Sequence, residues 1–243
     1  METLKTVGKF SLVLVASAAL TFGQSFGQTS NTQYPPAYPN NASQPSVGQP
    51  QTAMPGTVNY VEGQVSLDNR TLGPQGSATI EPGNALSTGN GFAEVLLTPG
   101  AFLRLGPNSQ IRLNTAGLAA TEIQLDRGTA NVEVDQLING THLTLTMNGA
   151  TVQLEKKGLY DLDANQQSVK VLDGKANIAI ASGAKSIGRG DQLLLSSDKP
   201  LKARGFDTKA EKAQPLYIWS EVRSRDESQA NVAISRRRWT PLT

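Results

Sequence analysis

Two short stretches of the sequence carry patterns that are associated with recognition or chemistry. Residues 189–191 read Arg-Gly-Asp, the tripeptide of cell-adhesion signals, and residues 23–27 read Gly-Gln-Ser-Phe-Gly, which fits the G-x-S-x-G pattern of serine hydrolases. A hydrolase serine needs a strained strand-to-helix turn with a histidine and an acid nearby. The meaning of both patterns therefore depends on the elements that hold them.

Acid–base catalysis has few candidate residues in this chain. The single histidine, His142, begins a predicted strand and is expected to point outward. The carboxylate pairs that a glycosidase would need are Glu133 with Asp135 and Asp161 with Asp163. Both pairs occupy alternate positions on the outward faces of predicted strands, so we interpret them as solubility residues. Cysteine is absent, as are phosphate-loop and zinc signatures, and the sequence predicts no catalytic residue, no cofactor and no metal site.

The beginning of the chain has the pattern of an export signal. Lys5 and Lys9 precede an apolar run over residues 10–22, which is too short to cross a bilayer comfortably. We therefore expect a signal peptide over residues 1–27, which removes the hydrolase pattern, and a periplasmic or secreted protein with no stable transmembrane anchor after cleavage. An uncleaved anchor is the alternative. The lack of cysteine excludes a lipoprotein.

Residues 28–56 form a segment of a different character. It is rich in proline, glutamine, asparagine and serine and contains almost no apolar residue that could offset the entropy of ordering. The composition predicts a disordered linker.

Apolar residues alternate with polar ones from Thr57 onward, with a turn signal at nearly every pause. Pro99-Gly100 and Asn148-Gly149 each separate two alternating runs and predict β-hairpins. Since parallel buried strands would be continuously apolar, we expect sheets with one solvated face. The pattern predicts an all-β domain over residues 57–198, as a two-layer β-roll, β-solenoid or jelly roll.

Internal repetition decides how the Arg-Gly-Asp tripeptide is interpreted. A glycine followed by an alternating strand recurs at Gly63, Gly128 and Gly174. Downstream of the first and third copies the chain repeats a second set of residues, in which four pairs align: Ile80 with Ile187, Gly83 with Gly190, Asn84 with Asp191, and Leu86 with Leu193. One copy of this step has no arginine, so we predict that Gly190-Asp191 forms a tight turn and not an adhesive ligand.

The order of these motifs resembles the FecR domain. The resemblance rests on "EPGNALS" (residues 81–87), "LRLGPNS" (103–109), "IQLDRGTANVEV" (123–134) and "VQLEKKGLYDLDANQQSVKVLDGKANI" (152–178), and it extends from about Thr57 to Leu195. It implies a periplasmic β-roll or β-solenoid that acts in cell-surface signalling, in which receptor occupancy is relayed to an extracytoplasmic sigma factor. We expect this chain to have the exported module without the cytoplasmic anti-sigma segment and transmembrane helix of the sigma regulators.

The last segment, residues 199–243, is predicted to be a basic helical tail. Apolar residues near helical spacing predict a helix from about Pro215 to Ser235, and Pro215 suits its first turn. Residues 199–238 contain ten Lys or Arg and five Asp or Glu. The candidate partner contacts are Trp219, Arg236, Arg237, Arg238 and Trp239. The alternative is a basic, solvated tail without a partner.

The sequence therefore predicts a non-catalytic interaction or sensing module of the bacterial cell envelope. Its partner would be an envelope protein or a cell-wall or surface polymer. Nucleic acid is not expected, because a basic, aromatic-rich face is missing and the formal net charge is only +2. The alternative is a periplasmic carrier of lipid or glycan, which would need an apolar cavity in the β domain.

Overall fold

A computed structural model describes the backbone of residues 54–73, 78–195 and 201–238 and the side chains as far as residue 229. The predicted signal peptide, the hydrolase pattern at residues 23–27 and most of the predicted linker lie outside these residues. The boundaries of the signal peptide, linker, β domain and tail stay predictions.

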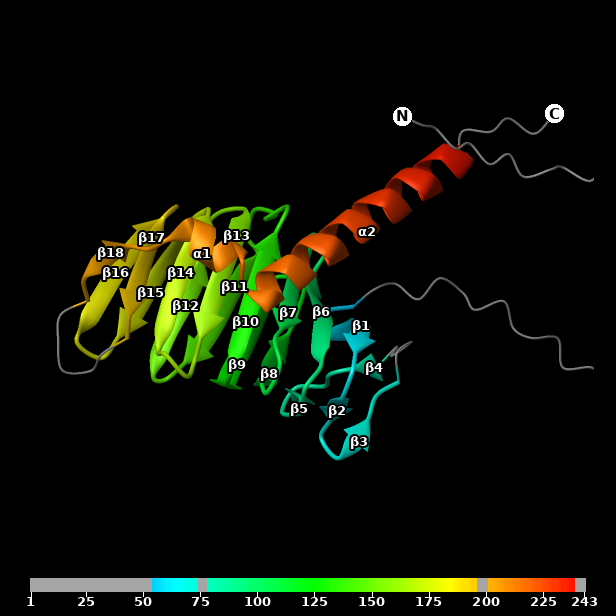
Figure 1. The fold of residues 1–243 in the computed structure, drawn as a ribbon, viewed down its shortest axis with the longest axis horizontal. Coiled ribbons are helices and arrows are strands. Elements are labelled where there is room, and N and C mark those ends of the chain that lie inside the picture. Colours follow the sequence, from blue (N-terminus) through cyan, green and yellow to red (C-terminus); the bar gives the residue numbers. More distant parts are fainter. Residues whose placement is uncertain (1–53, 74–77, 196–200, 239–243) are drawn as a thin grey trace, which may run out of the picture. The chain divides into compact units, whose positions relative to one another are not determined.

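The described strands form two nine-stranded sheets that face each other across one apolar core (Figure 1). The order in the first, sheet A, is β18 (Ala203–Gly205), β17 (Asp191–Leu194), β14 (Ser168–Asp173), β13 (Gly158–Asp163), β10 (Thr129–Val134), β7 (Ala101–Leu105), β6 (Phe92–Thr98), β1 (Thr57–Glu62) and β4 (Ala78–Thr79). The order in the second, sheet B, is β16 (Gly183–Gly188), β15 (Lys175–Ile180), β12 (Ala150–Leu154), β11 (His142–Met147), β9 (Ala120–Arg127), β8 (Gln110–Ala116), β5 (Ala85–Thr88), β2 (Val65–Leu67) and β3 (Arg70–Thr71).

The chain contributes one or two strands to one sheet and then crosses to the other. Thus β6 and β7 lie in sheet A, β8 and β9 in sheet B, and β10 in sheet A again. All described strand pairs are antiparallel except β9 with β11. This arrangement confirms the predicted fold class, an all-β two-layer domain followed by a helix.

The predicted hairpins are confirmed. Strands β6 and β7 pair on either side of Pro99-Gly100, and β11 and β12 pair around Asn148-Gly149. Asn148 and Gly149 have φ angles of 50° and 76°, and positive φ at both central residues is what a type I′ hairpin turn requires.

The turn at Gly190 is also confirmed. Gly190 has a φ of 84° and its aligned residue, Gly83, has a φ of 94°. The Asp191 carboxylate accepts a hydrogen bond from the backbone N–H of Gly188 at 3.1 Å, so that side chain stabilises the turn. The buried partners also match, because Ile80 and Ile187 are both in the core. The repeat therefore reflects a common backbone geometry.

Inward side chains of the two sheets form the core. The alanines that follow the turns are among its most buried members, and they allow the layers to approach closely: Ala93, Ala101, Ala130, Ala150 and Ala176. Tyr160 is the largest aromatic side chain that is fully buried, and its hydroxyl accepts a hydrogen bond from the Lys175 N–H at 3.1 Å.

Two helices follow the β domain, α1 (Thr208–Lys212) and α2 (Pro215–Arg238). Asp207 caps α1 by accepting hydrogen bonds from the N–H groups of Lys209 and Ala210. Helix α2 begins at Pro215, as predicted, and contacts β7 and β10 of sheet A. Neither described helix is long and apolar enough to span a membrane.

Candidate functional site

A row of polar side chains crosses the outer face of sheet A. The strand register places these residues directly opposite one another on successive strands, in the order Tyr60, Glu94, Arg104, Asn131, Asp161 and Lys170. Side chains alternate between the two faces of a strand, so all of them lie on the face turned away from the core. Helices α1 and α2 cover part of this row.

Arg104 lies at the centre of a buried cluster of charges between sheet and helix. Its Nε donates to Glu94 Oε2 at 2.8 Å, and the exposed fractions of the two side chains are 1% and 0%. Arg104 also pairs with Glu133 on β10 and, at 3.5 Å, with Glu227 on α2. Arg223 of α2 donates to the second oxygen of Glu94 at 3.0 Å. The cluster therefore joins strands β6, β7 and β10 to the helix.

The charges in this cluster shift one another's pKa values. Burial alone would raise the pKa of Glu94, but its hydrogen bond with Glu227 and the charge of Arg104 bring that pKa below its ordinary value. Burial, together with the hydrogen bond and charge of Glu94, raises the pKa of Glu227 to about 8. The two carboxyl groups therefore titrate as a coupled pair.

A second ionic group lies further along the same row. The Lys170 ammonium donates to Asp161 Oδ1 at 3.2 Å and to Glu211 Oε2 of α1 at 2.7 Å. Burial is the main cause that raises the pKa of Asp161 to about 7, and the negative charges of Glu211 and Asp163 add to it, whereas Lys170 opposes it.

The positions of the carboxylates correct one sequence-based expectation. Asp161 and Asp163 were expected on a solvated face, but both are only 6% exposed. Their outward direction on β13 was predicted correctly. The face itself is covered by α1 and the start of α2. Glu133 is also partly buried, through its bonds to Arg104 and Ser224, whereas Asp135 is exposed as expected.

An aromatic groove lies beside the charged cluster, where α2 passes β1 and β6. Trp219 stacks on Phe92, with ring centroids 5.1 Å apart and an interplanar angle of 15°. Its Nε1 donates to Glu62 at 2.8 Å, and the Arg223 guanidinium lies 4.2 Å from the centre of the Tyr60 ring. The groove has a volume of about 460 Å³, and the exposed side chains of Ile218 and Val222 form its outer wall.

The structure places only part of the predicted contact set. Trp219 lies in the aromatic groove, half-buried. Arg236–Arg238 form the end of α2, and their side chains lie outside the description, as does the whole of Trp239. The alternative of a solvated tail is wrong for Arg223, because that side chain is only 15% exposed and donates to Glu94.

Sequence reasoning missed the charged cluster. The predicted turn at Pro99-Gly100 does not pair these residues by itself, because a two-residue turn sets Glu94 opposite Leu105. A register shift between Leu96 and Thr98 brings Glu94 opposite Arg104. Nothing in the spacing of Arg223 and Glu227 indicated that they would cover this pair.

Most of the buried charged groups on this face lie in ion pairs. The buried acids and bases neutralise one another in ion pairs, and His142 is exposed on β11 away from them. Within the described residues, no three or more His, Cys, Asp or Glu side chains are arranged to hold a metal ion.

Together, these features define an all-β two-layer domain whose C-terminal helix is joined to one sheet by buried ion pairs. Residues 84–181 match the family model described as "FecR protein". The resemblance to the FecR family is thus confirmed for this segment of the chain. This match supports a signalling or regulatory role.

Comparison with solved structures gives two crystal structures, at 2.50 Å and 1.65 Å resolution, described as "a putative anti-sigma factor from Parabacteroides distasonis ATCC 8503". Their sequence identities to this chain are 17% and 16%, and each has a TM-score of 0.45. Each match covers 51% of this chain and 61% of the solved chain, so this chain spans about three fifths of their length. No curated protein matches.

The buried Asp161 leads to a prediction about pH. Its folded-state pKa of about 7 exceeds the ordinary 3.8, so the folded protein holds a proton that the unfolded chain has released. This contribution to stability is complete below the unfolded pKa and is lost as the pH rises through 7. Wild type should therefore lose more stability between about pH 4 and 7 than Asp161→Asn, as measured by urea midpoints across that range. Parallel profiles for the two proteins would contradict the assignment.

Proposed function

We propose that this chain is an exported, non-catalytic interaction or sensing module of the bacterial cell envelope. It binds a protein partner at the aromatic groove. The observation that carries the proposal is the groove itself, in which Tyr60, Phe92 and Trp219 are held in place beside the exposed side chains of Ile218 and Val222. Tyrosine, tryptophan and arginine dominate the energetics of protein interfaces, and here they occur together.

The structure of the groove supports a binding role. Trp219 is fixed by stacking on Phe92 and by the hydrogen bond to Glu62, so it loses little side-chain freedom when a partner binds. Arg223 is held between the Tyr60 ring and Glu94. Because the same arginine touches both the groove and the buried cluster, a partner in the groove bears directly on the joint between helix and sheet. This connection supports a sensing function.

The FecR match is the second support for the proposal. The family resemblance implies cell-surface signalling, and the predicted signal peptide implies export. The proposal includes neither a sigma factor nor a membrane receptor as a partner.

Site-specific photo-crosslinking in the native cells tests the proposal. A benzoylphenylalanine at Glu62, an exposed residue on the rim of the groove, should give an adduct with an envelope protein. The matched control carries the crosslinker at Leu118, which is 62% exposed. Leu118 is remote from the groove. The nearby Thr121 hydroxyl donates a hydrogen bond to the carbonyl oxygen of Leu97, at the opposite end of β6 from Phe92. This control should give no such adduct.

Three results together are expected. The tagged chain should be released by osmotic shock, the adduct from position 62 should be abundant, and Trp219→Ala should reduce it several-fold while the circular dichroism spectrum is unchanged. Retention of the chain in the cytoplasm, or equal adducts from positions 62 and 118, would contradict the proposal.

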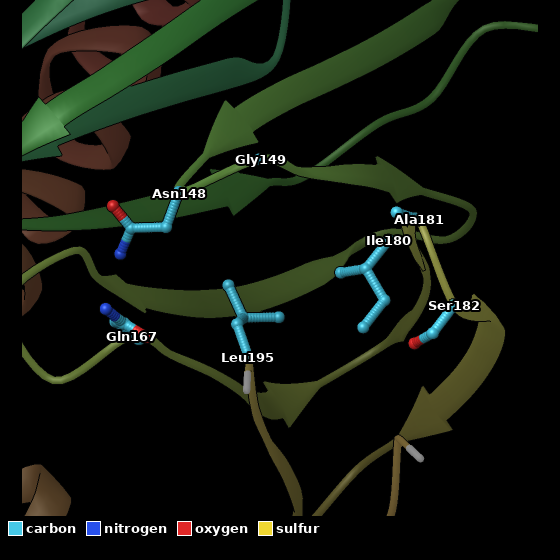
Figure 2. Close-up of a pocket in the computed structure, with 7 residues that line it drawn as sticks. All are labelled: Asn148, Gly149, Gln167, Ile180, Ala181, Ser182 and Leu195. Carbon is cyan, nitrogen blue, oxygen red and sulfur yellow. The ribbon is translucent and has the colours of Figure 1, made fainter. Parts of the chain in front are cut away.

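A second candidate function is a carrier of lipid or glycan, and one observation favours it. A cavity of about 530 Å³ opens at the β15 and β17 end of the two sheets (Figure 2). Its lining is mixed, with Ile180, Ala181 and Leu195 next to polar and glycine residues: Asn148, Gly149, Gln167 and Ser182.

The cavity does not continue through the core, because the inward side chains of both sheets pack against one another. This is why the carrier function ranks second. Extraction of the natively purified chain followed by mass spectrometry distinguishes the two functions. A stoichiometric lipid or glycan that is lost in Ala181→Trp would establish the carrier.

A further inference from the structure

A polar pocket of about 210 Å³ lies where α1 and the start of α2 cover sheet A, at the end of the polar row that is farther from the aromatic groove. Its sheet side includes three buried residues, Asn131 of β10 and Asp161 and Asp163 of β13, which are 2%, 6% and 6% exposed. Glu211 of α1 and Tyr217 of α2 line its helical side, and Figure 1 shows α1 over this part of the sheet. The pocket is therefore separate from the aromatic groove.

The charged side chains that line this pocket carry an excess of negative charge. They are three carboxylates and one ammonium: Asp161, Asp163, Glu211 and Lys170. The two lysines of α1, Lys209 and Lys212, are exposed and do not line the pocket, so solvent screens their charges. Because buried charges are screened much less, the pocket favours a positively charged group.

The hydrogen-bond acceptors of the pocket are only partly used. Lys170 donates to Asp161 Oδ1 and to Glu211 Oε2, and Asp163 Oδ1 accepts from two backbone N–H groups that follow it in the chain, at 2.9 and 2.8 Å. Within the described part of the chain, the second oxygen of each carboxylate accepts no hydrogen bond, and the buried Oδ1 of Asn131 also lacks a donor. Since an unpartnered buried acceptor is costly, these oxygens favour a ligand that is rich in N–H donors.

We propose that this pocket binds the guanidinium group of an arginine side chain from a partner protein. A guanidinium carries five N–H donors, no acceptor and a permanent positive charge, and its planar fork matches the geometry of carboxylates. It supplies donors to Asp163 and Asn131 and offsets the excess negative charge, whereas a lysine ammonium has only three donors on a point charge. The pocket volume equals that of about seven waters at about 30 Å³ each, which suits one side chain and not a folded segment.

Titration with Nα-acetylarginine amide, followed by two-dimensional NMR of the purified chain, tests the site. At low salt the probe should shift the backbone amide signals of residues that line the pocket, with a Kd of about 1 mM. The neutral isostere Nα-acetylcitrulline amide should bind at least about tenfold more weakly. Asp163→Asn should weaken the arginine probe by a similar factor, because it removes a charge while its Oδ1 can still accept both backbone hydrogen bonds. The matched control is Asp68→Asn, in an exposed turn of sheet B where Asp68 Oδ1 likewise accepts from a backbone N–H, and it should leave the affinity unchanged.

The pH dependence of binding gives a second readout. Lys170, Glu211 and Asp163 face the Asp161 carboxyl, whose pKa is about 7. Because Asp161 loses its proton as the pH rises, the arginine probe should bind several-fold more tightly at pH 8 than at pH 6, and Asp161→Asn should abolish this difference. Equal binding of the two probes, an unchanged affinity in Asp163→Asn, weaker binding at pH 8, or no shift of the lining residues at about 10 mM probe would overturn the proposal. So would stronger shifts of the same residues by glucose, which would identify a neutral polyol as the ligand.

Discussion

Replacing Arg104 with alanine is expected to lower the free energy of unfolding by about 3–5 kcal/mol, because it leaves a buried carboxylate without its main partner. Glu94 is 0% exposed and would keep only Arg223 as a counter-charge. Deleting one member of a buried pair is costly mainly because of the charge that stays behind. Urea denaturation monitored by tryptophan fluorescence measures the loss.

Two further variants make this prediction specific to the buried cluster. Arg112→Ala removes an arginine whose side chain is 43% exposed and lies 3.7 Å from Asp126. This substitution should lower the free energy of unfolding by less than about 1 kcal/mol, as the loss of an exposed ion pair does. The double variant Glu94→Leu/Arg104→Leu removes both buried charges and should regain most of the lost stability. An Arg104→Ala effect as small as that of Arg112→Ala would mean that solvent reaches the cluster.

Gly128→Ala is expected to lower the free energy of unfolding by about 2–5 kcal/mol. The left-handed backbone and the steric overlap of the added Cβ both contribute to this loss. Gly128 joins β9 to β10 with a φ of 81°. An added Cβ would lie 2.5 Å from the Cα of Ser109 and even closer to its hydroxyl. That hydroxyl accepts a hydrogen bond from the Thr129 N–H at 2.9 Å, so it cannot move without breaking the contact between the sheets.

Gly190→Ala is the matched control for the second prediction. Gly190 has nearly the same φ, 84°, but nothing lies within 4 Å of the position of an added Cβ. Its substitution should lower the free energy of unfolding by only about 1–2 kcal/mol, because the added Cβ disfavours the left-handed backbone but meets no neighbouring atom. Thermal unfolding of both variants measures the difference. Equal losses would show that conformation alone, and not the contact with Ser109, sets the requirement at position 128.

Much of the β domain could be predicted because its strands and turns are determined by residues that are close together in the sequence. Alternation identified the inward residues, turn residues such as Asn148-Gly149 placed the hairpins, and the alignment of Gly83 with Gly190 identified a shared turn. The start of α2 at Pro215 followed from helical spacing. Each of these features depends on residues that are close together in the sequence.

The candidate site could not be predicted, because it depends on which distant segments meet. Strand β10 pairs with β7 and β13, although β8, β9, β11 and β12 lie between them in the sequence. The face of α2 that contacts the sheet also carries Ser220, Ser224 and Glu227, so the usual apolar stripe that marks a docked helix is missing. The sequence alone predicts that the polar residues of sheet A and of α2 are solvated. In the structure they face each other and form ion pairs.

The alternating route of the chain between the two sheets has an architectural consequence. In each sheet, a strand or hairpin lies beside the one that precedes it in that sheet along the chain. Each pair of facing strands or hairpins therefore adds one slice, a cross-section of the two-layer body, to the length of the core. Such a stack can gain or lose a slice without a rearrangement of the others, as repeat proteins do. Evolution can thus change the length of the body by whole increments while it leaves the helix and its anchoring strands intact.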